Sequence, residues 1–152
     1  MSIDPAATRP AYWEPFVAAA REEKLVLQVC ESCGSVNYPP SETCANCLSN
    51  DLQWQEVNGS GRVLAITEVQ ATPDDFYRPL LPLAMGSVKL DCGPVVFAFF
   101  LDKDLAAGEK VEVRTAMDIR GVPLLVVHGQ DVSITSSDFD WKGSSFKQLF
   151  TG

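Results

Sequence analysis

Apolar residues after position 52 fall in short runs that are typical of β-strands. The runs are rich in β-branched and aromatic residues, and segments that contain Gly or Pro, such as NGSG, DCGP, AAGE and RGVP, separate them. This spacing predicts five or six strands in about 75 residues, which indicates a small antiparallel barrel of the OB type. The expected strands read LQWQEV, RVLAITEVQA, LAMGSVKL, VVFAFFL, KVEVRTAMDI and PLLVVHG.

Near the N-terminus the apolar spacing changes to the period of a helix. This period predicts one helix that ends near Lys24, with an aromatic face that packs either on its own domain or on a partner. Because proline is tolerated only in the first helical turn, Pro15 places the helix start as late as Glu14. The residues of the apolar face are Trp13, Phe16, Val17 and Ala20.

The pattern predicts a mainly β chain with four parts. An N-terminal arm and helix occupy residues 1–25, a cysteine-containing ribbon 26–52, the OB-type barrel 53–130 and a C-terminal tail 131–152.

Two further segments carry more aromatic and apolar groups than a solvated connection needs. The connection at 71–82 has the composition of an interface, and a loop folded back over the barrel mouth is the alternative. The apolar spacing in the tail predicts a short helix whose apolar face packs into a groove of this chain or of a partner. The residues concerned are Phe76, Tyr77, Arg78, Leu80 and Leu81 in the connection, and Trp141, Phe146, Leu149 and Phe150 in the tail.

Two CxxC pairs form the most specific chemical signal in the chain. Each pair places two sulfurs on a tight turn, and Gly34 follows the first pair, where a positive φ is often required. The ten residues between the pairs can fold as a short hairpin that brings the turns together. Zinc fits this closed set of thiolates best, and such a site builds structure because no position is left for water or substrate. The expected ligands are Cys30, Cys33, Cys44 and Cys47.

Two other interpretations of the cysteines stay open. A rubredoxin-type iron accepts the same spacing. Two CxxC redox pairs are the second alternative, although the βαβ pattern that usually surrounds such pairs is absent here.

Composition places the chain among compact globular proteins. Hydrophobic residues make up 46% of the sequence, enough for a core of about a hundred residues beside a metal-dependent subdomain. The first residues show no basic and apolar leader pattern, and no apolar run approaches the roughly 20 residues of a membrane span. We therefore expect a cytoplasmic location and no membrane partner, and the four of five cysteines that stand in ligand spacing fit a reducing compartment.

The charge of the chain argues against nucleic acid as a partner. The formal net charge is −8, and residues 21–60, which hold the ribbon, carry a net charge of −4. Nucleic-acid binders place Lys and Arg along the phosphates, so an acidic ribbon meets repulsion there.

A search for catalytic groups yields no residue to assign as catalytic. His128, the only histidine, lies in the apolar run LLVVHG, and Cys92 in the DCGP turn has no activating group near it in sequence. Asp74 and Asp75 are the closest approach to a carboxylate pair, but adjacent residues rarely converge on one bond. No GxSxG elbow, P-loop, GxGxxG after a strand or HExxH is present.

The order of the motifs resembles a known family. Residues 9–128 contain the following segments in order: RPAYWEPF, the ribbon CESCGSVNYPPSETCANC, the run WQEVNGSGRV, TEVQ, a proline-rich loop and GEKVEV. This order is similar to that of the rubredoxin-type zinc-ribbon plus OB-fold proteins associated with acyl-CoA metabolism. The resemblance implies a small non-catalytic partner of sterol-carrier-type thiolases or of related acyl-CoA aldolases and hydratases.

Carried over residue by residue, the resemblance places the metal ligands on the four paired cysteines and the barrel-opening glycines on Gly59 and Gly61. Two departures are visible. Ser41 and Glu42 stand after the prolines where an arginine is common, and Leu48 follows the second pair where glycine is commoner. The missing arginine removes one possible contact to a CoA phosphate.

The sequence therefore predicts an accessory subunit that binds a thiolase-like enzyme acting on a β-oxoacyl-CoA, with a bulky or aromatic acyl group implied by the resemblance. Zinc is the expected cofactor of this chain. A coenzyme A ester is expected only as a ligand that the partner enzyme brings to the complex. Two hypotheses of other classes remain, a nucleic-acid-binding ribbon and OB protein, and a stand-alone acyl-CoA enzyme that uses Cys92 or His128.

Overall fold

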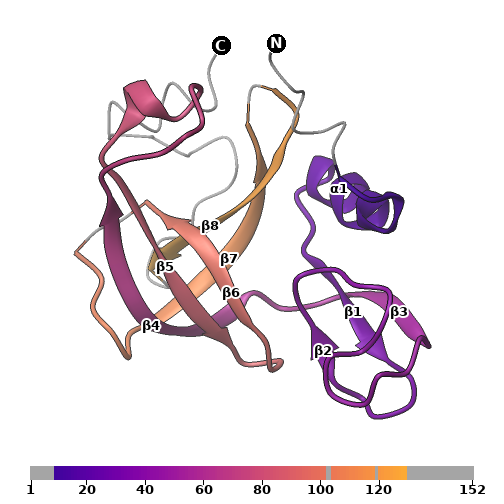
Figure 1. The fold of residues 1–152 in the computed structure, drawn as a ribbon. Coiled ribbons are helices and arrows are strands. Elements are labelled where there is room, and N and C mark those ends of the chain that lie inside the picture. The colour runs from indigo at the N-terminus through magenta and orange to yellow at the C-terminus, as the bar shows by residue number, and fades with distance from the viewer. Residues whose placement is uncertain (1–8, 102–103, 119, 130–152) are drawn as a thin grey trace.

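Two sheets and one helix make up the part of the chain that the computed structural model describes, which is residues 9–101, 104–118 and 120–129. A closed barrel lies beside a small sheet, and the helix α1 lies near both (Figure 1). The predicted mainly β fold with an N-terminal helix is confirmed. The aromatic residues expected to form a helix in the tail lie outside the described residues.

The helix α1 spans Glu14–Arg21, directly after the 3₁₀ turn η1 at Ala11–Trp13. It ends before the expected Lys24 because Glu23 adopts a left-handed backbone with φ 59°. Phe16 is 2% exposed and joins the main core, and its ring packs edge-on against Trp13 with 5.7 Å between centroids. Of the two alternatives for the aromatic face, packing on its own domain is therefore the one observed.

The ribbon sheet contains β1 (Val26–Cys30), β2 (Val36–Asn37) and β3 (Leu52–Glu56) in the order β2-β1-β3. The run LQWQEV was expected to open the barrel, but β3 instead pairs antiparallel with the whole of β1. The backbone N–H of Val57 then donates to the carbonyl of Leu25 at 2.9 Å, which keeps the chain beside the ribbon for one more residue. Apolar spacing identifies this strand but carries no information on its partner.

The barrel contains five strands, each close to a predicted apolar run. They close in the order β4-β5-β6-β8-β7, which is the connectivity of an OB fold. Four of the pairings are antiparallel, but β6 and β8 run parallel through Phe99↔Val126 and Phe100↔Val127, so the barrel is not wholly antiparallel as expected. The strands are β4 (Ser60–Val69), β5 (Leu83–Leu90), β6 (Val95–Phe100), β7 (Lys110–Met117) and β8 (Pro123–Gly129).

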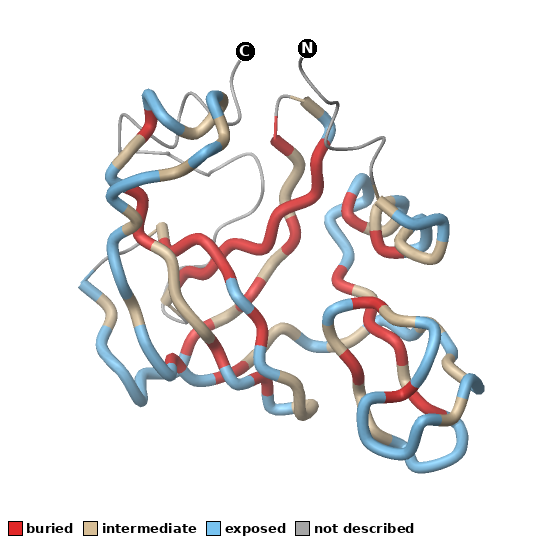
Figure 2. The backbone as a smooth tube through the Cα atoms, in the orientation of Figure 1, coloured by how far each residue is buried: buried red, intermediate tan, exposed pale blue. Residues whose placement is uncertain are grey.

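One apolar core runs from the barrel into the helix and the ribbon. Alternate side chains of the barrel strands point inward, and the buried segments concentrate on the strands in Figure 2. Phe16, Leu25 and Leu27, which precede the barrel, belong to the same cluster of buried residues. The barrel members of that cluster include Val63, Val88, Val96, Phe100, Val111 and Val127.

Gly59 makes the closest backbone approach where the barrel begins. Its carbonyl accepts a hydrogen bond from the N–H of Val113 at 2.8 Å, and a Cβ placed on Gly59 would lie 1.9 Å from the carbonyl oxygen of Val113. Any side chain at this position must push β7 away from the chain that enters β4.

Gly59→Ala is expected to lower the free energy of unfolding by roughly 2 kcal/mol, because overpacking that shifts backbone costs about this much. Urea unfolding measures the change. Ser60→Ala at the neighbouring half-buried position is the control and should unfold like the wild type. Equal stability of the two variants would contradict the close approach.

Among the described residues, no helix is long and apolar enough to cross a membrane.

Candidate functional site

The four paired cysteines come together at one end of the ribbon. Cys30 ends β1, Cys33 follows in the first turn, and Cys44 and Cys47 lie in the second turn before β3. Their four sulfur atoms lie within 4.8 Å of one another. Cys30 and Cys44 are buried, whereas Cys33 and Cys47 are exposed, so each turn offers one sulfur on the inside and one toward solvent.

The two turns have the same backbone geometry. In the first, the N–H of Gly34 donates to the carbonyl of Cys30 at 2.7 Å, and in the second the N–H of Leu48 donates to that of Cys44 at 2.9 Å. Gly34 has φ 75° and Leu48 has φ 63°. The left-handed backbone expected at Gly34 is therefore present at both positions, and Leu48 adopts it at a cost of about 1 kcal/mol relative to glycine.

The spacing of the sulfurs fits one tetrahedral ion. A tetrahedron with metal–sulfur bonds of about 2.3 Å has edges of about 3.8 Å. The Cys30 and Cys47 sulfurs are 3.6 Å apart, and those of Cys33 and Cys44 are 3.7 Å apart. The cysteines are therefore positioned to bind a metal.

Two asparagines complete the surroundings of the sulfurs. The Nδ2 of Asn37 donates to the sulfur of Cys44 at 3.5 Å, while its Oδ1 accepts from the N–H of Ala45 at 2.9 Å. Asn46 donates through its backbone to Cys44 at 3.4 Å and through Nδ2 to Cys33 at 3.6 Å. N–H donors to sulfur stabilise the thiolate form, which is the form that binds a metal.

The sulfurs have divergent proton affinities when no cation is near. Hydrogen bonds from Ser35 and then from Asn46 lower the pKa of Cys33 to about 5. Cys47 also receives a backbone hydrogen bond, from Ser49, but partial desolvation of its sulfur and contacts with the three neighbouring sulfurs outweigh it and raise its pKa to about 12. Thiolates this close repel one another, so a cation is needed before all four can be ionised together.

Gln28 ties the segment between the two turns to β1. It is buried, its Nε2 donates to the carbonyl of Ser41 at 2.8 Å, and its Oε1 accepts from the N–H of Ser41 at the same distance. The backbone of Ser41, which follows the two prolines between the turns, thus anchors this segment. Sequence reasoning missed Asn37, Asn46 and Gln28, because their contacts join turns that are distant along the chain.

Cys92 and His128 lie on different parts of the barrel. Cys92 belongs to the turn between β5 and β6, and burial raises the pKa of its thiol above the ordinary value. That shift disfavours the nucleophilic thiolate. His128 is 3% exposed on β8, where its Nδ1 lies 3.0 Å from the carbonyl oxygen of Gly129. Both environments are those of structural residues.

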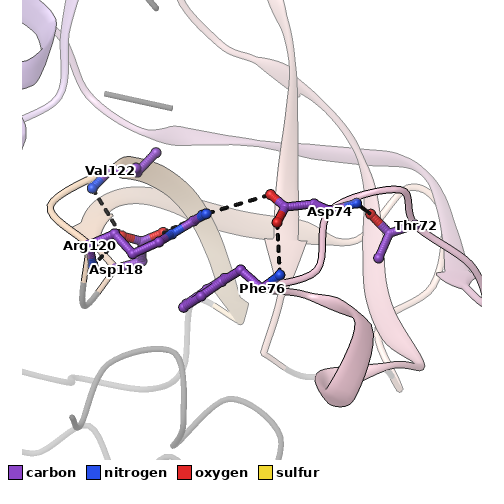
Figure 3. A network of polar contacts seen from close by, with 6 residues as sticks. All are labelled: Thr72, Asp74, Phe76, Asp118, Arg120 and Val122. Atoms are coloured by element: carbon purple, nitrogen blue, oxygen red, sulfur yellow. Dashed lines mark hydrogen bonds and ion pairs between the residues drawn. The ribbon is translucent and has the colours of Figure 1, made fainter. Parts of the chain in front are cut away.

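The connection at 71–82 folds back over the barrel, which is the alternative to a free interface loop. Tyr77 stacks on Phe99 of β6 with 5.8 Å between ring centroids. The guanidinium of Arg120, from the turn between β7 and β8, lies 3.8 Å over the ring of Phe76 and 3.6 Å from Asp74 (Figure 3). Arg120 thus joins the two loops that flank one face of the barrel.

Asp118 anchors this arginine from inside. Its side chain is fully buried, and its Oδ2 accepts from Nη2 of Arg120 at 2.9 Å. Its Oδ1 accepts from the backbone N–H groups of Arg120 and Val122 at 2.8 and 3.0 Å. Burial, and then the carboxylate of Asp118, raise the pKa of Tyr77. The network is a structural clamp between loops that are distant in sequence.

Comparison with known families decides where the chain belongs. The rubredoxin-like zinc ribbon domain of ChsH2 matches residues 17–53, and the C-terminal OB-fold domain of ChsH2 matches residues 54–116. The chain belongs to the ChsH2 family. This family is also designated DUF35, and its first domain is the zinc ribbon that holds the four cysteines.

Proteins similar to this chain include a scaffold protein and an enzyme subunit. The DUF35 domain-containing scaffold protein of Pyrococcus furiosus is 34% identical over 110 residues, which cover 68% of this chain and 75% of that protein. A protein of Thermomonospora curvata named as a probable enoyl-CoA hydratase alpha subunit is 30% identical over 83 residues. That match covers 55% of this chain but only 24% of the hydratase subunit.

Solved structures show the same fold. A chain of the Ltp2-ChsH2(DUF35) aldolase superposes with a TM-score of 0.64 and 23% identity, over 78% of this chain and 97% of that one. A DUF35 protein of unknown function from Sulfolobus solfataricus superposes with a TM-score of 0.53 and 15% identity, over 72% of this chain and 81% of that one. At these identities the likeness concerns the fold.

Proposed function

We propose that this chain is a non-catalytic scaffold subunit of a cytoplasmic, thiolase-like acyl-CoA enzyme. The observation that carries the proposal is the four-thiolate ribbon joined to a barrel in which neither Cys92 nor His128 stands in a catalytic environment. Membership of the ChsH2 family supports it, because relatives in that family are named as scaffold proteins or as an enzyme subunit.

Zinc has a structural role in this proposal. Cys30, Cys33, Cys44 and Cys47 hold it, and no ligand position is left for a substrate. The chain's own contribution is to bind, through the ribbon and the barrel, an enzyme that cleaves a β-oxoacyl-CoA with a bulky acyl group. The names of the related aldolase and hydratase subunit make those enzyme classes the nearest alternatives for the partner.

The charge of the chain and the ion pairs of the described residues support a protein partner over nucleic acid. The net charge is −8, and basic side chains around the helix and barrel already pair with carboxylates, as in Lys24–Glu22 and Arg114–Glu112. A phosphate backbone needs basic groups that are available along its path.

Co-purification tests the proposal. The tagged full-length chain, expressed in its own host, is expected to retain an acyl-CoA enzyme subunit through gel filtration, and mass spectrometry identifies that subunit. A tagged chain that elutes alone, or that retains nucleic acid in a salt-dependent manner, would overturn it.

Cys92→Ala is expected to retain most of the activity of the assembled complex, because burial keeps this thiol protonated. The rate of β-oxoacyl-CoA cleavage measures this, and metal content serves as the folding control. Loss of a true nucleophile lowers the rate by at least about a hundredfold, so a decrease of that size in a zinc-loaded complex would contradict the scaffold role.

A further inference from the structure

The strand β8 divides its side chains between two apolar clusters. Leu125 and Val127 belong to the main core inside the barrel. Leu124 and Val126 belong to a second buried cluster, on the outer face of the barrel. Because side chains alternate between the two faces of a strand, His128 lies on the same face as Leu124 and Val126. These three residues are the outer row of β8.

The outer row is buried although it faces away from the barrel core. Val126 is 2% exposed and His128 is 3% exposed. Outward positions that lack cover are exposed on the same barrel, as Phe97 of β6 shows at 69%. The burial arises within a single chain, so another segment of this chain lies over the row.

The connection at 71–82 covers the beginning of the outer row. Its Phe76 lies under the guanidinium of Arg120, in the turn that leads into β8 (Figure 3). Its Tyr77 reaches the strand β6 beside the middle of the row. His128 lies at the far end, roughly 13 Å beyond the first residue of the row at a rise of about 3.3 Å per residue. The ring contacts of the connection thus gather at the beginning and the middle of the row.

The connection between β6 and β7 passes the far end of β8 on the inner side. Leu105 packs against the main core, and a Cβ placed on Gly129 would lie 3.8 Å from its Cδ2 atom. This leucine therefore helps to close the end of the barrel rather than its outer face.

The segment 130–152 follows β8 directly at the far end of the outer row. It begins after Gly129, one residue beyond His128, and it lies outside the described residues. A helix of nine residues spans about 14 Å, so the segment is long enough to turn back and run along the whole row. Its attachment to β8 gives it an effective concentration in the millimolar range at this face. Its aromatic residues are Phe139, Trp141, Phe146 and Phe150.

We propose that the segment 130–152 turns back after β8 and buries its aromatic side chains on the outer row. The occupant of this face is then the chain itself, held by apolar contacts to Val126 and to the ring of His128. The inference does not rest on the proposed function. An enzyme partner that used the same face would first have to displace the segment.

Modification of His128 by diethyl pyrocarbonate tests the cover, because the reagent acylates accessible imidazole rings and His128 is the only histidine. The isolated chain carries a purification tag without histidine, and mass spectrometry follows the modified peptide. We expect deletion of residues 132–152 to raise the rate at His128 at least about tenfold. Zinc content and slow amide exchange in β7 and β8 show that the truncated chain keeps its fold.

A full-length variant decides the matter if the truncated chain does not fold. It combines Phe139→Ser, Trp141→Ser, Phe146→Ser and Phe150→Ser, which keep the length and charge of the segment, and it should also expose His128 to the reagent. Lys142→Ala with Lys147→Ala is the matched control, because it keeps the aromatic residues and should react like the wild type.

Two results would overturn the proposal. His128 that stays slow to react in the folded variants would mean that the connections between the strands provide the cover. Rapid reaction of His128 in the wild-type chain by itself, with protection only in a purified complex, would make the partner enzyme the occupant of the outer row.

Discussion

Cys44→Ser is expected to abolish zinc binding and to unfold the ribbon while the barrel stays closed. Cys44 is fully buried between the two turns and accepts hydrogen bonds from Asn37 and Asn46. Structural zinc contributes about 10–16 kcal/mol of apparent binding free energy in small zinc domains, so a domain of this size depends on it. Metal analysis should give one zinc per wild-type chain and close to none in the variant.

Hydrogen exchange localises the effect of this substitution. Amides of β1 should lose protection, whereas those of β5 and β6, which pair only within the barrel, should keep it. Cys92→Ser is the matched control, since Cys92 lies outside the cluster, and it should keep its zinc. Full zinc content in Cys44→Ser, or iron in place of zinc in a freshly prepared wild-type sample, would contradict the assignment.

Arg120→Ala is expected to lower the free energy of unfolding by about 3 kcal/mol, because it leaves the carboxylate of Asp118 buried without its ion partner. The same change removes the cation over the ring of Phe76, so the connection at 71–82 should also become more susceptible to protease. Urea unfolding and limited proteolysis measure the two effects.

Arg78→Ala is the matched control for the clamp. Arg78 pairs with Asp75 on the same connection, but both side chains are largely exposed, at 60% and 86%. Exposed pairs contribute at most about 1 kcal/mol, so this variant should unfold close to the wild type. If the two arginine variants lose equal stability, the buried position of Asp118 is not what makes the clamp important.

The sequence predicted the elements well because each is specified locally. CxxC spacing with Gly34 led to the cysteine cluster, and strand runs such as LAMGSVKL coincide with the observed β5. The pairing partners of the strands could not be predicted in the same way, because the alternation of apolar residues is the same whichever strand lies alongside. The run at 52–57 was therefore assigned to the barrel, although β3 belongs to the ribbon sheet, and the parallel pairing of β6 with β8 was not foreseen.

The polar groups around the site could not be predicted, since they depend on contacts between distant residues. Nothing local to Asn37 indicates a donor to Cys44, and nothing local to Arg120 indicates that it meets Asp74 and Phe76. The aromatic composition of the connection at 71–82 suggested either an interface or a packed loop. The stacking of Tyr77 on Phe99 and the position of Arg120 over Phe76 distinguish the two.

A thioester turnover assay with three samples distinguishes a scaffold subunit from an enzyme. The isolated chain, the isolated partner enzyme and the purified complex are each given a β-oxoacyl-CoA ester, and the release of free coenzyme A is followed. We expect no turnover by this chain alone and faster cleavage by the complex than by the partner alone. Turnover by the isolated, zinc-loaded chain would contradict a non-catalytic scaffold.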